Sequence, residues 1–315
     1  MGWWLFAIVL ALALAGGAVW QRLCARRDEQ AFPCPGVIVE ACGARLHVRA
    51  EGEGQRVVLL SGWGTAVPSA DFQPLATELI RRGFRVVIPE KPGYGFSPDT
   101  RAPRALDAVL DELRGALAQA GEEGPYILMG HSMAGVELLR WACRFPKEVL
   151  ALYSLDAPAP MCYQTVPTPP MFAAYIQRAQ RFFGLKRLSM AIPRFRRGYW
   201  KYLNNYRYLD PALLPLEKAM TIKNGGNHAT WDEMKRLKEN AKLAGGSVPE
   251  GIPLTMFIAS DTKEKRWAQL QPEEDAYIAR NHAKTMVLEG LHNLQHYQPM
   301  RMAEIVAADW EARKQ

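Results

Sequence analysis

Charged side chains are absent from the first twenty residues, MGWWLFAIVLALALAGGAVW. As a helix this stretch would be about 30 Å long, which is enough to cross the hydrocarbon core of a bilayer. Tryptophans lie at both of its ends, where the membrane interface favours them. We therefore predict a transmembrane anchor over residues 1–21 and a linker over residues 22–35. A cleaved signal peptide is the alternative, because the small residues ALA precede Gly16.

Acidic side chains are absent from residues 171–208, a segment that carries nine basic ones. The formal net charge of the whole chain is +7, so the remainder is slightly acidic. The excess of basic over acidic residues thus lies in one segment, and no nucleic-acid-binding motif accompanies it. We therefore expect no nucleic-acid partner. Aromatic residues alternate with the basic ones. This pattern is typical of a surface against anionic lipid, of an apolar substrate pocket, or of a solvated basic face with aromatics packed beneath it.

Cysteine is scarce, and the five residues form no obvious disulfide framework. An odd number of cysteines favours a reducing compartment, although Cys34 and Cys42 could pair if the body faced outward. Arginines follow the apolar span at Arg22, Arg26 and Arg27. The positive-inside rule then places the body of a single-pass membrane protein on the cytoplasmic side.

Internal repeats are also absent, and apolar runs typical of buried strands alternate with amphipathic helical segments instead. Such strands occur at RVVLLSG, FRVVIPE, YILMG, EVLALYSLDA, PLTMFIASD and KTMVLEG, after a β-hairpin at VIVEACGARLHVRAEGEG. This alternation predicts an α/β fold with a mostly parallel sheet flanked by helices. The alternation of strands and helices is interrupted once, over residues 160–250. The sequence therefore predicts a core over residues 36–159 and 251–315, with a helical cap insertion over residues 160–250.

A serine lies between a predicted strand and a predicted helix in the sequence YILMGHSMAG. Ser132 there resembles the nucleophile of a G-x-S-x-G turn, with Gly130 before it and Ala134 in place of the second glycine. The helix that follows would direct its first amides toward a developing negative charge. Alternatively, Ser132 only caps that helix.

A serine nucleophile needs a base, and the base needs a carboxylate to orient it. His292 follows the last predicted strand, and Asp261 follows the strand before it, so both are expected at the carboxyl edge of the sheet. The order Ser132, Asp261, His292 suits this type of serine turn. Asp156, at the end of the strand after the nucleophile's, is the alternative acid.

An oxyanion hole needs two amides beside the serine. We expect one from Met133, directly after the serine. The second is expected from Trp63, because glycines flank it in the loop SGWGT after an early strand.

These motifs together resemble the α/β-hydrolase fold superfamily in its hydrolase-1 branch, over residues 36–159 and 251–312. The resemblance rests on GWG, PGYGFS, GHSMA and GLHNLQHYQP in this order. Departures are Ser61 for a frequent histidine, Glu90-Lys91 where Asp-Arg is common, and Ala134. The resemblance implies serine-hydrolase chemistry and leaves the substrate open.

We therefore expect a serine hydrolase that cleaves a carboxylic ester or related acyl bond through an acyl-enzyme, with no metal ion or organic cofactor. The substrate would be a small acyl compound, and lipid-like esters are a candidate class because the anchor precedes an aromatic cap. An aminopeptidase of the proline-iminopeptidase type and a catalytically silent binding protein are the alternatives.

Overall fold

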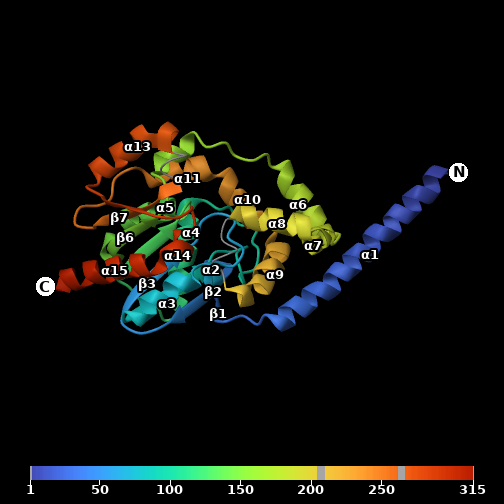
Figure 1. The fold of residues 1–315 in the computed structure, drawn as a ribbon, viewed down its shortest axis with the longest axis horizontal. Helices are drawn as coiled ribbons and strands as arrows, with labels where there is room; N and C mark the ends of the chain where they lie inside the picture. The colour runs from blue at the N-terminus through green and yellow to red at the C-terminus, as the bar shows by residue number, and fades with distance from the viewer. Residues whose placement is uncertain (1, 204–209, 262–266, 315) are drawn as a thin grey trace.

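A computed structural model describes residues 2–203, 210–261 and 267–314. Its centre is an eight-stranded sheet in the order β1-β2-β4-β3-β5-β6-β7-β8 (Figure 1). The strands are β1 Val37–Ala41, β2 Ala44–Glu51, β3 Gln55–Leu60, β4 Phe84–Glu90, β5 Tyr126–His131, β6 Val149–Leu155, β7 Leu254–Ala259 and β8 Lys284–Leu288.

The first two strands form the predicted hairpin, with Ala41 paired to Ala44 across its turn. β2 is antiparallel to β4, and every later pairing in the sheet is parallel. The central parallel strands are buried along almost their whole length, since helices cover both faces of the sheet. This burial explains why they are continuous apolar runs in the sequence.

Helices on the two faces build two separate apolar cores. The core-domain helices are α2 Pro68–Asp71, α3 Gln73–Arg81, α4 Leu106–Gln119, α5 Ala134–Arg144, α13 Trp267–Arg280, α14 Leu294–Tyr297 and α15 Pro299–Lys314, with a 3-10 turn η1 Pro146–Glu148. On one face α4 packs Leu110, Leu113 and Leu117 toward the sheet, at the spacing of a single helix face. On the other face α3 and α15 pack together beneath the sheet.

The segment between β6 and β7, which we call the cap after its predicted role, contains helices and turns in its described residues and no strand. Its elements are η2 Pro160–Gln164, α6 Phe172–Phe182, α7 Leu185–Ala191, α8 Pro193–Leu203, η3 Pro211–Leu213, α9 Leu214–Asn224, α10 His228–Lys235 and α11 Leu237–Ala244. Part of the basic segment predicted from the sequence, residues 204–208, lies outside the described residues.

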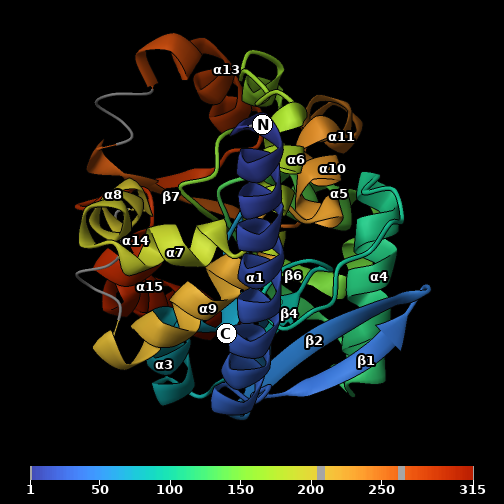
Figure 2. The same ribbon diagram turned by 90° about the vertical axis from the view of Figure 1, so that its right-hand side faces the viewer.

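The N-terminal helix α1, Gly2–Ala31, extends away from the body in Figure 1 and lies in front of it in the view of Figure 2. It is long and apolar enough to cross a membrane, and its apolar part is not buried against the rest of the protein. The helix includes most of the predicted linker, because residues 22–31 contain neither glycine nor proline. It packs against α6 and α9. Gly17 permits a close approach, since a Cβ atom there would lie 2.4 Å from the Phe183 carbonyl oxygen.

Candidate active site

Ser132 lies on a tight turn between β5 and α5. Its φ angle is +54°, a left-handed conformation, and its amide donates a 3.0 Å hydrogen bond to the Leu155 carbonyl. A non-glycine residue in this conformation is strained, and such strain is typical of functional turns. A Cβ atom on Gly130 would come within 2.8 Å of Leu138, and one on Gly135 within 2.8 Å of Ala157. Glycine is thus favoured at 130 and 135, because even the Cβ of alanine would be too close to these neighbours.

His292 bridges the serine and a carboxylate. It lies in the loop after β8, and its Nε2 is 3.0 Å from Ser132 Oγ. Its Nδ1 is 2.5 Å from Oδ2 of Asp156. The predicted pairing of Ser132 with His292 is therefore present in the structure.

The acid in contact with His292 is Asp156, so our preference for Asp261 is corrected. Asp156 directly follows β6, the neighbour of β5 in the sheet, and its side chain is 1% exposed. Its φ is +47°, its amide donates to Phe257 O at 2.7 Å, and its Oδ1 accepts from the Ala259 amide at 2.9 Å. These bonds fix the carboxylate and direct Oδ2 toward His292.

Asp261 lies two residues beyond the end of β7. Its amide donates to the Gly290 carbonyl at 3.3 Å, in the loop that leads from β8 toward His292. Chain order alone could not separate the two aspartates, because both follow a strand at the same edge of the sheet.

The loop after β3 runs directly beside the nucleophile. A Cβ atom on Gly62 would lie 2.9 Å from Ser132 Cβ, so only glycine allows this approach. Neither the Trp63 amide nor the Met133 amide donates a hydrogen bond to any residue in the described ranges. The Trp63 indole is held by the cap, since its Nε1 donates to Thr230 O at 2.6 Å. Both predicted oxyanion amides therefore lie on segments next to Ser132, without another acceptor.

His131, directly before the serine, takes part in the site although no sequence motif predicted a role for it. Its Nε2 donates to the His292 carbonyl at 3.1 Å. Burial, with the neighbouring His292 as a smaller cause, lowers the pKa of His131 to about 4. The neutral ring therefore positions the backbone of His292 and carries no charge near neutral pH.

Tyr163 of η2 is a second site residue that the sequence did not reveal. The tyrosine is 7% exposed, and its hydroxyl has no hydrogen-bond partner among the described residues. Burial raises its pKa, and the Ser132 hydroxyl is among the groups that act on it. A buried hydroxyl without a partner is costly. The effect of Ser132 on its pKa places this hydroxyl near the nucleophile.

A cavity of about 240 Å³ lies next to the oxyanion loop, between the core and the cap. Trp63, Thr65 and Ala66 line it from the core side. Thr221 and Asn224 of α9 line it from the cap side. The described residues contain no group of three or more histidine, cysteine or acidic side chains placed to hold a metal ion.

A further pair, His296 and Asp71, lies behind the loop. His296 Nε2 is 2.9 Å from Asp71 Oδ1, and both side chains are buried. His296, the other histidine of the loop, thus has a packing partner of its own. Glu217 of α9 is also buried, and this burial, with the charge of Asp71, raises the pKa of Glu217 to about 8.

Replacing Glu217 with glutamine should change how stability depends on pH. An unfolded glutamate has a pKa of about 4.3. Between that value and about 8 the folded protein holds a proton that the unfolded chain has lost, so stability falls as the pH rises. Glu217→Gln removes this titration. We expect its melting temperature to match the native value near pH 4 and to exceed it near pH 8.

The control for this variant is Glu239→Gln, which neutralises an exposed glutamate of α11. Its melting temperature should follow the native curve across the whole pH range. If the melting temperatures of the native protein and of Glu217→Gln changed in the same way between pH 4 and pH 8, Glu217 would be ionised in the folded state and the prediction would be wrong.

Residues 55–283 match the protein family described as the alpha/beta hydrolase fold. The uncharacterized protein YbdG of Bacillus subtilis is 27% identical over 272 residues, which cover 84% of this chain and 82% of that protein. A pimeloyl-acyl-carrier protein methyl ester esterase of Xanthomonas axonopodis is 23% identical over 268 residues, 85% of this chain and 92% of that protein.

Among solved structures, epoxide hydrolase VrEH1 from Vigna radiata matches with a TM-score of 0.62 and 16% identity, over 88% of this chain and 97% of that one. At this identity the likeness concerns the fold. The family match spans most of the chain and includes the turn that carries Ser132. The protein therefore belongs to the α/β-hydrolase fold family and is a hydrolase.

Proposed function

We propose that the protein hydrolyses a carboxylic ester or related acyl bond with Ser132 as nucleophile, His292 as base and Asp156 as the orienting acid. The observation that carries this proposal is the continuous chain of contacts from Ser132 Oγ through both nitrogens of His292 to Asp156 Oδ2. A hydroxyl, an imidazole and a buried carboxylate in this geometry are the elements of nucleophilic acyl transfer.

In the first half of the reaction, His292 Nε2 takes the proton of Ser132 as Oγ attacks the carbonyl carbon. Asp156 stabilises the imidazolium that results, and the Trp63 and Met133 amides donate to the oxyanion. The tetrahedral intermediate then expels the alcohol, which receives its proton from His292. Water repeats the sequence on the acyl-enzyme and releases the carboxylic acid, which restores Ser132.

Epoxide hydrolysis, the activity named for several structures with this fold, suits Ser132 poorly. Opening an epoxide with a serine oxygen would form an ether, which water does not cleave under mild conditions. A carboxylate nucleophile would instead form an ester that water can hydrolyse. The residue on the turn after β5 is a serine, so an acyl substrate fits the site better.

The substrate class that we propose is an ester of an apolar acyl group. The cavity beside the oxyanion loop has room for part of an acyl chain, and it is lined by Trp63, Tyr199 and Trp231 among others. The similarity to a pimeloyl-acyl-carrier protein methyl ester esterase supports an acyl ester as substrate.

We also propose that α1 anchors the hydrolase to a membrane as a single-pass helix. Its length and exposed apolar surface support a span. The arginines that follow the apolar part favour a body on the cytoplasmic side.

Hydrolysis of p-nitrophenyl esters with acyl chains of increasing length would test the catalytic proposal. We expect an initial burst of p-nitrophenol equal to the enzyme concentration, because an acyl-enzyme forms before water cleaves it. Prolyl p-nitroanilide tests the aminopeptidase alternative, and an epoxide tests the activity of the structural neighbours. Turnover of the epoxide or the anilide without turnover of any ester would contradict the proposal.

A further inference from the structure

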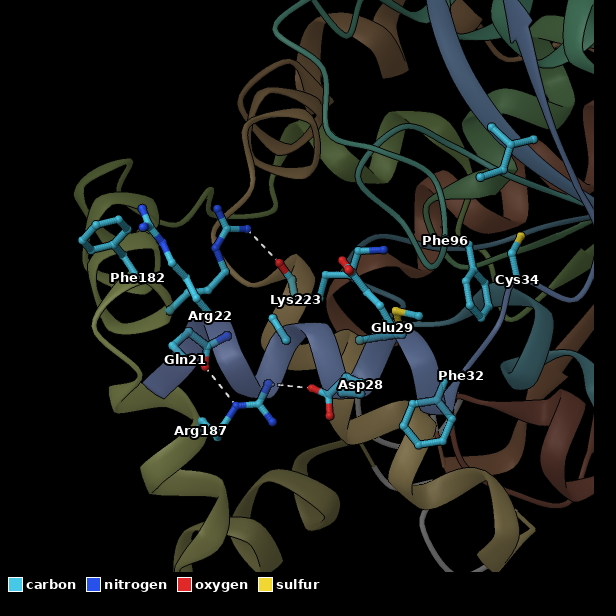
Figure 3. Close-up of a pocket in the computed structure, with 15 residues that line it drawn as sticks. Gln21, Arg22, Asp28, Glu29, Phe32, Cys34, Phe96, Phe182, Arg187 and Lys223 are labelled. Atoms are coloured by element: carbon cyan, nitrogen blue, oxygen red, sulfur yellow. Dashed lines mark hydrogen bonds and ion pairs between the residues drawn. The ribbon is translucent and has the colours of Figure 1, made fainter. Parts of the chain in front are cut away.

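A second cavity lies between the N-terminal helix and the cap, and its lining residues differ from those of the cavity beside the oxyanion loop. It has a volume of about 460 Å³, within the range of ligand-binding pockets. Helix α1 forms one wall from Gln21 to Glu29, Phe32 just after the helix extends it, and α9 forms another with Ala219, Met220 and Lys223 (Figure 3). None of the three residues of the Ser132 site lines it.

This cavity, which we name the α1 pocket, combines positive charge with apolar surface. Four basic and two acidic side chains line it, so its net charge is +2. The basic residues are Arg22, Arg181, Arg187 and Lys223, and the acidic ones are Asp28 and Glu29. The apolar surface comes from Phe32, Ile38, Phe96, Phe182 and Met220.

Two of these cations already have partners in the pocket wall. Arg187 pairs with Asp28 at 2.6 Å and donates to Gln21 at 2.9 Å, while Arg181 donates to the Lys223 carbonyl at 2.8 Å (Figure 3). Arg22 and the Lys223 ammonium make no hydrogen bond or ion pair with the rest of the described chain. They are therefore free to bind an anion inside the pocket.

The α1 pocket also lies where the apolar part of α1 ends. Gln21, the first buried residue of the helix, lines the pocket, and the exposed apolar stretch precedes it directly. The cap beside this point exposes large apolar side chains among its basic residues. They include Phe172, Tyr175, Ile176, Phe182, Leu188 and Phe195 on α6, α7 and α8. Figure 2 shows α7 and α9 beside α1.

Exposed apolar and basic side chains on one surface are typical of a membrane interface that contains anionic lipid. If α1 spans a bilayer, the cap surface and the mouth of the α1 pocket lie at the headgroup level. A ligand would then enter from the membrane with its charged end toward Arg22 and Lys223 and its chain against the aromatic residues.

We propose that the α1 pocket binds one anionic phospholipid, whose phosphate contacts Arg22 and Lys223 and whose acyl chain packs on Phe32, Phe96 and Met220. The proposal rests on the membrane anchorage proposed above and is independent of catalysis. The bound lipid would fix the cap to the membrane side of α1.

The test uses the full chain with Ser132→Ala, so that the probe cannot be hydrolysed, in phosphatidylcholine nanodiscs. The nanodiscs contain a small fraction of phosphatidylglycerol with a diazirine in its acyl chain. After irradiation, mass spectrometry locates the adducts. We expect them on peptides that contain Phe32, Phe96 or Met220. Unlabelled phosphatidylglycerol should compete, whereas phosphatidylcholine and inorganic phosphate should not.

The double variant Arg22→Gln/Lys223→Gln should lower labelling of these peptides about tenfold or more, because each cation contributes to binding of an anionic headgroup. The matched control Arg26→Gln/Lys235→Gln removes the same charge from exposed positions outside the pocket and should label as the parent does. Ala25→Phe fills the pocket without changing charge and should also lower labelling.

Three results would overturn the proposal: adducts confined to residues 2–20, equal labelling by a phosphatidylcholine probe, or labelling that neither Arg22→Gln/Lys223→Gln nor Ala25→Phe reduces. Elution of the protein with the nanodiscs reports the anchorage separately. Ester turnover by the chain with Ser132 intact reports the hydrolase proposal, so each failure can be told apart.

Discussion

Asp156→Asn is expected to lower kcat for ester hydrolysis by about four orders of magnitude while leaving the fold intact. In serine hydrolases the carboxylate holds the histidine in the tautomer whose Nε2 can accept the serine proton, and an asparagine permits the wrong tautomer. Asp156 Oδ2 is 2.5 Å from His292 Nδ1, and its other oxygen is held by the Ala259 amide. The effect should therefore appear in kcat more than in KM.

The matched control is Asp261→Asn, which makes the same chemical change at the end of the next strand. Because Asp156 is the aspartate in contact with His292, we expect Asp261→Asn to keep kcat within a few-fold of the native value. Steady-state kinetics on one p-nitrophenyl ester measures both variants. If Asp261→Asn lost the larger share of activity, our assignment of the acid would be wrong.

Lys91→Met is expected to destabilise the protein by about 3–5 kcal/mol, a large part of the stability of a typical domain. Lys91 is 3% exposed, and its Nζ lies 2.5 Å from Glu137 and 2.6 Å from Glu233. Glu233, on cap helix α10, also accepts a hydrogen bond from the Tyr94 hydroxyl. Removing the lysine leaves two buried carboxylates without their cation, which costs far more than losing an exposed pair.

Urea denaturation of the detergent-solubilised chain measures this effect, with Lys235→Met, an exposed lysine of α10, as the control. Burial raises the pKa of Glu137 to about 7 although Lys91 lowers it, so removing Lys91 raises this pKa further above the unfolded value of about 4.3 and the folded variant binds an extra proton. Its stability should therefore fall as the pH rises, and the deficit should shrink toward pH 4. A deficit equal to that of Lys235→Met would show that the cluster adds nothing.

The sheet and the serine turn could be predicted because their signals are local. Apolar runs such as YILMG and LTMFIA are buried strands, and the hairpin around Gly43 has the predicted pairing. Gly130 is required by Leu138 on the helix that follows, and Ser132 has its left-handed conformation on the short turn between them. Such short-range patterns determine strand and turn formation.

The acid and the supporting residues depend on contacts between distant segments. Asp156 contacts His292 because β6 lies beside β5 and the loop after β8 returns to them, an arrangement that strand order in the sequence does not specify. Tyr163 is positioned by the segment after β6, on η2. His131 is positioned by the loop that carries His292, about 160 residues away. The packing of Gly17 against Phe183 likewise requires knowledge of where the cap lies.

The most direct test of the account is the site of covalent labelling by a fluorophosphonate, found by mass spectrometry of the native protein and of Ser132→Ala. An activated serine attacks phosphorus and displaces fluoride, which leaves a stable phosphonyl ester. We predict one adduct, on Ser132, in the native protein and none in the folded variant. Absence of an adduct on folded native protein, or an adduct that persists in Ser132→Ala, would contradict the claim that Ser132 is the nucleophile.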